Sequence, residues 1–189
     1  MNRLITNPGF QMDEISEYSI SLPKDAERIN SIIIKECKKL NLNTKKITIT
    51  DSTACVGGNT VLFCKIFKKV NAIEIDHDRY KMLKNNLNLS KYLNYDIYND
   101  DYLNLCDKIK QDVIFIDPPW GGKDYKLKQN IELELSNIKL DMLINILKHF
   151  AVLIVLKLPL NYNIDSINEP NKKVYVLNKM MILVVSVVE

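Results

Sequence analysis

Short apolar runs alternate with segments of helical hydrophobic period along most of the chain. Apolar side chains recur at helical spacing in residues 24–40, and the same spacing predicts helices at 59–67, 78–89, 102–109 and about 138–150. The runs typical of strands lie between these segments, at 46–50, 70–75, 95–98, 113–116 and 151–156. Strands that alternate with helices in this way predict a parallel sheet covered by helices on both faces.

The C-terminal segment departs from this alternation. Two apolar runs, 174–177 and 181–188, are separated by Asn178 and Lys179, a pattern that indicates two antiparallel strands joined by a tight turn. The fold class predicted is therefore α/β, with a mostly parallel seven-stranded sheet that ends in an antiparallel hairpin. Residues 1–23 have no clear period, so we predict a short N-terminal arm followed by a single domain at 24–189.

Composition adds limits to this picture. A chain of 189 residues with 47% hydrophobic residues suits one globular domain with a real core, and a net charge of +3 permits an anionic partner without demanding one. The four cysteines are scattered and the two histidines have no partners at ligand spacing, which favours reduced thiols and no metal site. The N-terminus lacks the apolar core of a signal peptide, and the longest apolar runs are much shorter than the roughly 20 residues of a membrane span. We expect a soluble intracellular protein of the nucleus or cytoplasm, including that of a virus-infected cell, with no membrane contact.

The most informative motif is the hexapeptide Asp117–Gly122, which follows the buried strand predicted at 113–116. Ligands of open α/β sheets bind at the carboxyl ends of strands. Two consecutive prolines stiffen the backbone there and leave its carbonyls free to accept hydrogen bonds. An acid and a free carbonyl can hold both hydrogens of an exocyclic amino group on a base, while the indole of Trp120 stacks on the ring. The motif therefore predicts a site for a planar ring that bears an amine.

Three further turns after predicted strands carry candidate ligand groups. The loop 51–60 places Gly57 and Gly58 between a strand and a helix, where a ligand can approach backbone N–H groups. Glu74 lies at the end of the second predicted strand, where an acid commonly binds ribose hydroxyls, and Asp76 is its close rival. A third acidic turn, 99–102, could hold an adenine amino group. Taken singly, the two glycines favour a plain turn, Asp76 fits a helix cap better than Glu74 does, and the 99–102 turn is equally compatible with a cap. Four such turns together favour a ligand site.

Together these stretches resemble the trimethylguanosine synthase family, S-adenosylmethionine-dependent class I methyltransferases with a Rossmann-like fold that methylate N2 of the 7-methylguanosine cap of RNA. The resemblance rests on Asp51 with the loop 56–60, on 72–76 and on Asp101-Tyr102. It rests further on Pro118-Pro119-Trp120-Gly121-Gly122 with Asp124-Tyr125, and on an N-terminal pattern over 10–23. It spans roughly residues 10–161, and Pro-Pro-Trp-Gly-Gly is quite specific for this family.

The resemblance implies a role for each matching position. Asp117 and Pro118 would accept the amino hydrogens of the guanine, and Trp120 would stack on its ring. The cofactor would be held by Asp51, Thr53, Gly57, Asn59, Thr60, Glu74, Asp76, Asp101 and Tyr102. The capped RNA would also contact Gly121, Tyr125, Asn161 and Lys24, and the arm would contribute to the substrate site. The resemblance implies no metal, and we expect a monomer.

Two other functions are compatible with the same motifs. Asp-Pro-Pro-aromatic also occurs in amino-methyltransferases that act on adenine. A cap-binding module without methyl transfer is the second alternative, because Thr53 and Cys55 replace the family's aromatic residue and first glycine in the cofactor loop. Leu160 stands where the family has an arginine that contacts phosphate, and Lys24, Lys123, Lys126 or Lys157 could substitute for it.

Overall fold

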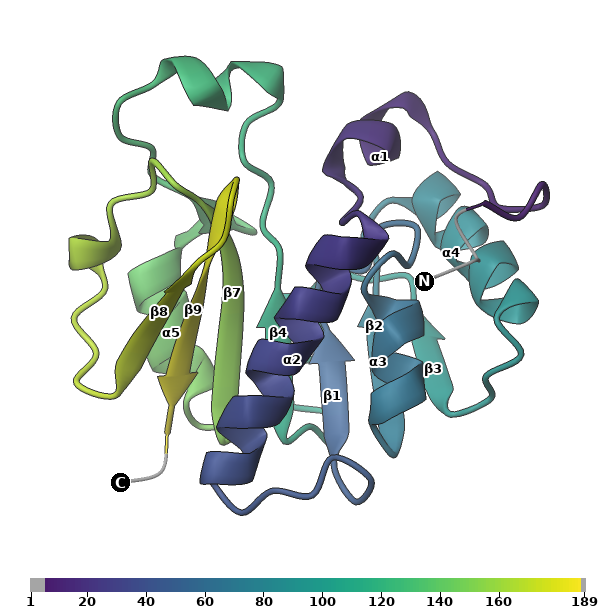
Figure 1. Ribbon diagram of the computed structural model, residues 1–189, viewed down its shortest axis with the longest axis horizontal. Coiled ribbons are helices and arrows are strands. Elements are labelled where there is room, and N and C mark those ends of the chain that lie inside the picture. The colour runs from purple at the N-terminus through teal and green to yellow at the C-terminus, as the bar shows by residue number, and fades with distance from the viewer. Residues whose placement is uncertain (1–5, 188–189) are drawn as a thin grey trace.

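In the computed structural model, which describes residues 6–187, seven strands form one sheet in the order β3-β2-β1-β4-β7-β9-β8 (Figure 1). Five strands are parallel: β1 (Thr48–Asp51), β2 (Lys69–Ile73), β3 (Tyr95–Tyr98), β4 (Val113–Ile116) and β7 (Leu153–Pro159). The hairpin of β8 (Lys172–Val176) and β9 (Met180–Ser186) adds to β7 through an antiparallel pairing. The predicted seven-stranded sheet with a C-terminal hairpin is therefore confirmed. Residues 1–5 of the predicted arm and the last residue of the predicted final strand lie outside the described residues.

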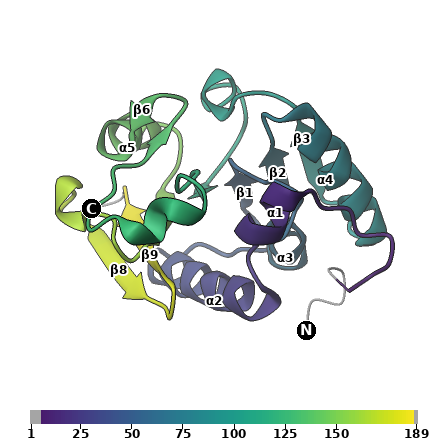
Figure 2. The same cartoon turned by 90° about the horizontal axis from the view of Figure 1, so that it is seen from above.

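Helices cover the two faces of this sheet unequally (Figure 2). One face packs against α2 (Pro23–Lys39), α3 (Thr60–Ile66) and α4 (His77–Leu89), and side chains such as Ile33, Phe63 and Leu83 form a fully buried core there. The other face packs against α5 (Leu140–Leu147) and the 3-10 turn η1 (Tyr102–Asn104). The almost continuous apolar sequences of β4 and β7 fit this arrangement, because both faces of these strands are buried.

The helix predicted at 102–109 is wrong. Only the 3-10 turn η1 forms, and the chain then continues through turns to β4. Side-chain hydrogen bonds replace some of the backbone hydrogen bonds of a helix in this segment. The Asp101 carboxylate accepts the Leu103 N–H at 2.9 Å, and the Gln111 amide donates to the Cys106 carbonyl at 2.8 Å. The Gln111 side chain is buried, with 7% exposed, and the hydrophobic period of the sequence does not indicate this burial.

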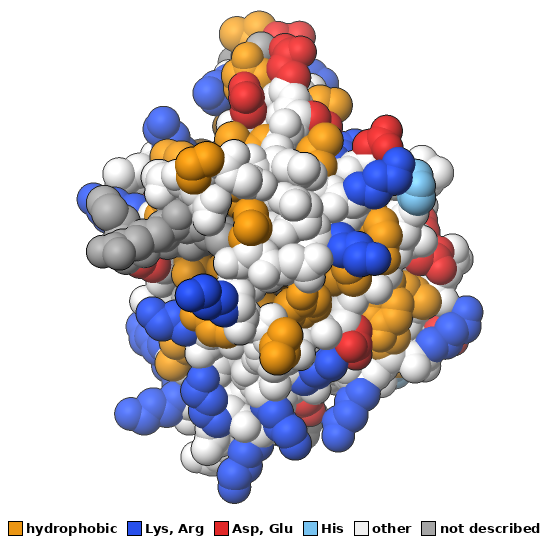
Figure 3. Space-filling model, turned by 90° about the vertical axis from the view of Figure 1, so that its right-hand side faces the viewer, with side chains coloured by type: hydrophobic (Ala, Val, Ile, Leu, Met, Phe, Trp, Pro, Cys, Tyr) orange, Lys and Arg blue, Asp and Glu red, His pale blue; other side chains and the backbone are white. Residues whose placement is uncertain are grey.

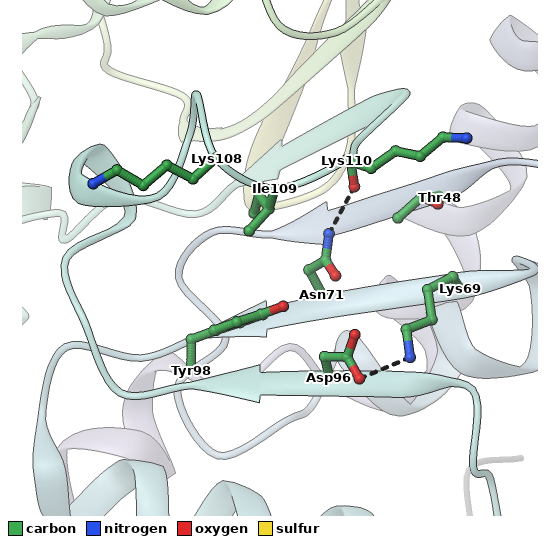
Figure 4. A pocket seen from close by; sticks show the side chains of 8 residues that line it. All are labelled: Thr48, Lys69, Asn71, Asp96, Tyr98, Lys108, Ile109 and Lys110. Carbon is green, nitrogen blue, oxygen red and sulfur yellow. Dashed lines mark hydrogen bonds and ion pairs between the residues drawn. The ribbon is translucent and has the colours of Figure 1, made fainter.

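The shortened connection leaves part of the sheet without a helix on one face. A hollow of about 350 Å³ lies there, over the polar side of β1, β2 and β3 (Figure 4). Its lining consists of Thr48, Lys69, Asn71, Asp96, Tyr98, Lys108, Ile109 and Lys110. The alternating sequences of these three strands fit this position, because a strand that is buried on both faces is apolar throughout.

The N-terminal arm contains a short helix that the sequence pattern did not reveal. Helix α1 (Glu14–Ser19) begins at a capping box in which the Asp13 side chain accepts the Ser16 N–H at 2.7 Å and the Ser16 hydroxyl accepts the Asp13 N–H at 2.8 Å. Six residues are too few to show a helical period. The helix lies above the carboxyl ends of β1 and β2 (Figure 1), so the arm is placed over the turns that carry the candidate ligand groups.

Smaller elements complete the chain between β4 and β8. The loop after β4 contains the 3-10 turn η2 (Lys123–Leu127) and the two-stranded ribbon of β5 (Glu134–Leu135) and β6 (Ile138–Lys139), so α5 begins two residues later than predicted. A further 3-10 turn, η3 (Ile164–Ser166), follows β7. Across residues 6–187, no helix is long and apolar enough to cross a lipid bilayer.

Candidate functional site

Asp51 ends β1 with a carboxylate that is buried and only half satisfied. The side chain is 1% exposed, and its Oδ2 accepts the Thr60 hydroxyl at 2.6 Å. Its Oδ1 is buried without a hydrogen-bond partner among the described residues. Burial, together with the nearby carboxylates of Asp117 and Glu74, raises the pKa of Asp51 to about 7, against the opposing hydrogen bond from Thr60. A buried oxygen without a donor is costly, so this position suits a ligand that brings a cationic N–H group.

The loop after β1, residues 52–59, is the candidate cofactor loop, and it packs closely against the N-terminal arm. Gly57 has a φ of +95°, a conformation that side chains other than glycine rarely adopt. At Gly58 a Cβ atom would lie 2.6 Å from the Ile20 Cγ1 atom, so the arm packs directly on this glycine. A hollow of about 20 Å³ separates the two segments. Asn59 joins them as well, because its amide donates to the Ser21 hydroxyl at 3.1 Å, while its Oδ1 is buried without a partner among residues 6–187.

Glu74 and Asp76 follow β2 and serve different neighbours. The Glu74 carboxylate is 7% exposed and accepts the N–H groups of Cys55 at 2.8 Å and Asp76 at 2.9 Å, which ties the turn after β2 to the cofactor loop. Burial raises the pKa of Glu74, against the opposing effect of Arg79. Asp76 is the N-cap of α4, because its Oδ1 accepts the N–H groups of Asp78 at 3.0 Å and Arg79 at 2.9 Å. Glu74 therefore lies nearer the loop, and the capping role predicted for Asp76 is present.

The turn after β3 carries Asp101 and Tyr102, whose side chains have different surroundings. Asp101 caps η1, with its Oδ1 on the Leu103 N–H. Tyr102 is 2% exposed and packs in the core with side chains of α5, and its hydroxyl donates a hydrogen bond to the Gln111 Oε1 atom at 3.3 Å. The resemblance assigns Tyr102 to the cofactor, but this burial does not fit that role, because the side chain packs in the core.

The hexapeptide after β4 stands beside the cofactor loop. β1 and β4 are neighbours in the sheet, and Asp51 pairs with Phe115 in their register. The Asp117 N–H donates to the Thr53 hydroxyl at 2.8 Å, which joins the two loops. The Asp117 Oδ2 accepts the Lys157 ammonium at 2.6 Å, and both side chains are largely buried. Burial raises the pKa of Asp117, and the charge of Lys157 opposes that rise.

Trp120 is half-buried between neighbours that restrain its ring. Its indole N–H donates to the Lys157 carbonyl at 3.3 Å, and its ring meets the Tyr125 ring edge-on at a centroid distance of 5.1 Å. Gly121 and Gly122 have φ angles of +89° and +77°, and a Cβ atom on either would meet nothing within 4 Å. The two glycines therefore serve the sharp turn after the indole, in space that is open to a ligand.

Of the remaining predicted substrate residues, Asn161 contacts the loop that follows Trp120. The Asn161 amide donates to the carbonyls of Tyr125 at 2.7 Å and Lys128 at 2.8 Å, so it shapes the loop that carries Tyr125. Lys24 is exposed in the first turn of α2. Leu160 is 51% exposed. Figure 3 shows lysine and arginine side chains spread around the lower part of the face that it views, without a single basic stripe.

Three residues of the site were not assigned these roles from the sequence. Lys157 was considered only as a phosphate contact, yet it lies in the interior beside Asp117. Asn86 is fully buried in α4 and bonds both to the backbone of Gln11 in the arm and to the Val56 carbonyl of the cofactor loop. Arg79 lies among three acids, 3.2 Å from Asp76 and 4.0 Å from Asp13 and Glu74. The sequence does contain a sign of two of these roles: Lys157 interrupts an apolar strand, and Asn86 lies beside the buried leucines of α4.

The described side chains include no cluster of three histidine, cysteine or acidic residues that could hold a metal ion. They do fit an organic cofactor with a cationic amino group and ribose hydroxyls, because Asp51 offers an orphan buried oxygen and Glu74 offers a carboxylate directly after β2. The groups lie at the carboxyl ends of adjacent parallel strands, where such ligands bind.

Comparison with known proteins identifies relatives of this site and fold. The family described as RNA cap guanine-N2 methyltransferase matches residues 46–188. An uncharacterized protein, L320 of Acanthamoeba polyphaga mimivirus, is 43% identical over 140 residues, which make up 71% of this chain and 54% of that protein. The chain therefore spans about half the length of this curated relative.

Solved structures share the fold at low sequence identity. The 16S rRNA N2 G1207 methyltransferase of T. thermophilus, in complex with AdoMet and guanosine, has a TM-score of 0.66 at 11% identity, over 95% of this chain and 44% of that one. An RNA methyltransferase from Salinibacter ruber, in complex with S-adenosyl-L-homocysteine, has a TM-score of 0.61 at 11% identity, over 89% and 94% of the two chains. The fold is that of class I methyltransferases, whose cofactor is S-adenosylmethionine, and the chain belongs to the RNA cap guanine-N2 methyltransferase family.

Proposed function

We propose that this protein transfers a methyl group from S-adenosylmethionine to the exocyclic N2 amine of the 7-methylguanosine cap of RNA. The observation that carries the proposal is the hydrogen bond from the Asp117 N–H to the Thr53 hydroxyl, 2.8 Å long. It joins the acceptor loop, with its acid, prolines and indole, to the loop that would hold the methyl donor. Family membership supports the same reaction class.

The donor side would use the acids at the ends of β1, β2 and β3. Asp51 would receive the amino group of the methionine moiety at its unpartnered Oδ1, next to Gly57, Asn59 and Thr60. Glu74 would accept ribose hydroxyls and Asp101 the adenine amine, while Asp76 holds the start of α4. When bound, S-adenosylmethionine supplies an electrophilic methyl carbon on a sulfonium.

The acceptor side would hold the guanine by its amine and by its ring. One Asp117 oxygen is taken by Lys157, so the Oδ1 oxygen and the Pro118 carbonyl would accept the two N2 hydrogens. Trp120 would stack on the ring, more strongly when N7 methylation makes that ring cationic. Tyr125 braces the indole at its edge, and Gly121 and Asn161 keep the surrounding loop in place.

With both sides occupied, the protein's task is alignment. N2 must lie about 3 Å from the methyl carbon, in line with the departing sulfur. A strong general base is unnecessary, because the amine can release its proton after the new bond has formed. Asp117 would orient the nitrogen lone pair, and a pair of placed acceptors contributes a few kcal/mol to such a step.

The experiment incubates the protein with 7-methylguanosine diphosphate and labelled S-adenosylmethionine, and identifies the product by mass spectrometry. N2-methylated product, lost in Asp117→Ala, supports the proposal. Transfer to adenine in uncapped oligonucleotides, without competition from the cap analogue, would support an adenine amino-methyltransferase instead. Calorimetry separates the non-catalytic alternative, because a cap-binding module would bind the analogue without binding S-adenosylmethionine.

A further inference from the structure

Lys157 is a charged residue inside a strand that is otherwise apolar. It belongs to β7, whose seven residues are all buried, and its side chain is 5% exposed. Burying an ammonium is costly unless it is paired and hydrogen-bonded. Its partner is Asp117, whose side chain is 17% exposed, and the two charged atoms are 2.6 Å apart.

An ion pair of this kind is weak evidence for stability, because apolar residues of similar size pack at least as well in many cores. Its position therefore calls for another explanation. β7 is the neighbour of β4 in the sheet, so a side chain from β7 can reach the turn that follows β4. Lys157 reaches the acidic residue that opens the hexapeptide there.

The same lysine also contacts the indole. Its Nζ atom lies 5.3 Å from the centroid of the Trp120 ring, within the range of a cation–π contact. Its backbone carbonyl accepts the indole N–H at 3.3 Å. One residue thus holds both the group that would grip the acceptor amine and the ring that would carry the acceptor base.

We propose that Lys157 is the positioning residue of the acceptor site, which fixes Asp117 with a single carboxylate oxygen available to the acceptor amine and fixes the plane of Trp120 beside it. This inference rests on the proposed function, since it assigns a role within the same site. Lys157 needs no contact with the methyl donor for this role, and its interior position separates it from the cap phosphates.

Two consequences distinguish this role from packing. The Asp117 Oδ2 is occupied, so the amine has one carboxylate acceptor and its second hydrogen must go to another group such as the Pro118 carbonyl. Among the described residues, the charged groups that face Asp117 are Lys157 and Asp51. The carboxylate of Asp51 does not oppose protonation of Asp117, so Lys157 is the group that keeps Asp117 ionised. Without Lys157, Asp117 would take up a proton at higher pH and lose its ability to accept from the amine.

The test compares Lys157→Met with Lys148→Met, a matched control whose ammonium binds Glu169 at 2.8 Å away from the acceptor loop. With 7-methylguanosine diphosphate as acceptor and saturating S-adenosylmethionine, Lys157→Met should lower kcat about 100-fold, the scale of a misplaced reactant. The Kd for S-adenosylmethionine, measured by calorimetry, should stay within about twofold. The acidic limb of the kcat profile should move up by about one pH unit or more. Lys148→Met should match the wild type in all three.

A kcat of Lys157→Met within about threefold of the wild type would overturn the inference, and so would parallel loss of kcat and cofactor affinity. If Lys157→Met does not fold, the double variant Asp117→Asn/Lys157→Met removes both charges at nearly constant volume. The double variant should bind the cofactor and remain as slow as Asp117→Asn alone, whereas recovery to the wild-type rate would refute the role. Failure of the proposed function is seen separately, as absence of product from the wild-type protein.

Discussion

Replacing Asn86 by alanine should loosen the N-terminal arm and the cofactor loop together. The buried Asn86 amide accepts the Gln11 N–H at 2.8 Å and donates to the Gln11 carbonyl at 2.8 Å and the Val56 carbonyl at 2.9 Å. Gln11 is exposed and can bind water instead, but Val56 is fully buried, so its carbonyl would be left without a donor. One orphan buried acceptor costs about 1–3 kcal/mol, and the small cavity and the two weakened arm contacts bring the loss of unfolding free energy to about 2–4 kcal/mol.

Urea unfolding measures this loss, and the same helix offers a control. Asn88 is exposed in α4 and accepts one hydrogen bond from the Tyr95 hydroxyl at 3.1 Å, so Asn88→Ala should change the free energy of unfolding by less than about 0.5 kcal/mol. Limited proteolysis should cut the arm of Asn86→Ala faster than that of Asn88→Ala, and calorimetry should show weaker binding of S-adenosylmethionine. A loss below about 1 kcal/mol, together with wild-type proteolysis of the arm, would refute the reasoning that Asn86 joins these segments.

Three further predictions concern single residues. Asp51 has a pKa raised from 3.8 to about 7, so between these values the unfolded chain ionises while the folded chain keeps its proton. The free energy of unfolding should therefore fall as pH rises through this window, by up to about 1.4 kcal/mol per pH unit, and Asp51→Asn should flatten the slope in urea unfolding without cofactor. Glu36 behaves oppositely: burial raises its pKa, but hydrogen bonds from Lys39, Tyr175 and Lys173 outweigh burial and lower it to about 2. Glu36→Gln should lower the free energy of unfolding by about 1–3 kcal/mol at neutral pH, and this difference from the wild type should vanish as pH falls from about 4.5 towards 2. If urea unfolding shows the same difference at every pH, the ionised Glu36 does not stabilise the fold through these partners. Trp120→Ala should weaken binding of 7-methylguanosine diphosphate by about 1–3 kcal/mol in calorimetry, the scale of one lost base stack, and unchanged affinity would argue against stacking.

Prediction from the sequence was most accurate for short strands whose ends are marked by turn residues. The strands β3 and β4 begin and end where the sequence predicts, because each is a short apolar or alternating run between turn residues. The four candidate ligand turns follow strands in the structure for the same reason, since the carboxyl end of each strand is visible in the sequence. Asp51 ends β1, and Glu74 and Asp117 directly follow β2 and β4.

What the sequence could not supply are contacts between residues far apart in the chain. Lys157 meets Asp117 across 40 positions, and Asn86 meets Gln11 across 75. Neither pairing follows from local period, because each depends on which strand lies beside which and on where the arm returns. Tyr102 illustrates the converse: a tyrosine beside acids in a loop was assigned to a ligand, although the shortened η1 turns its ring into the core.

The short connection between β3 and β4 has a consequence for the dynamics of the two halves of the sheet. β4 and β7 are buried along their whole length between helices, while β3 is only half-buried and borders the hollow over β1 and β2. Amide groups beneath a thin polar cover open to solvent at lower free energy than those between two apolar layers. Deuterium should therefore enter β3 and β2 before β4 and β7. Asp117 follows β4 and Lys157 lies within β7, whereas Glu74 and Asp101 depend on the half of the sheet that should open more readily. One part of the candidate site should therefore stay rigid while the other adjusts to an incoming ligand.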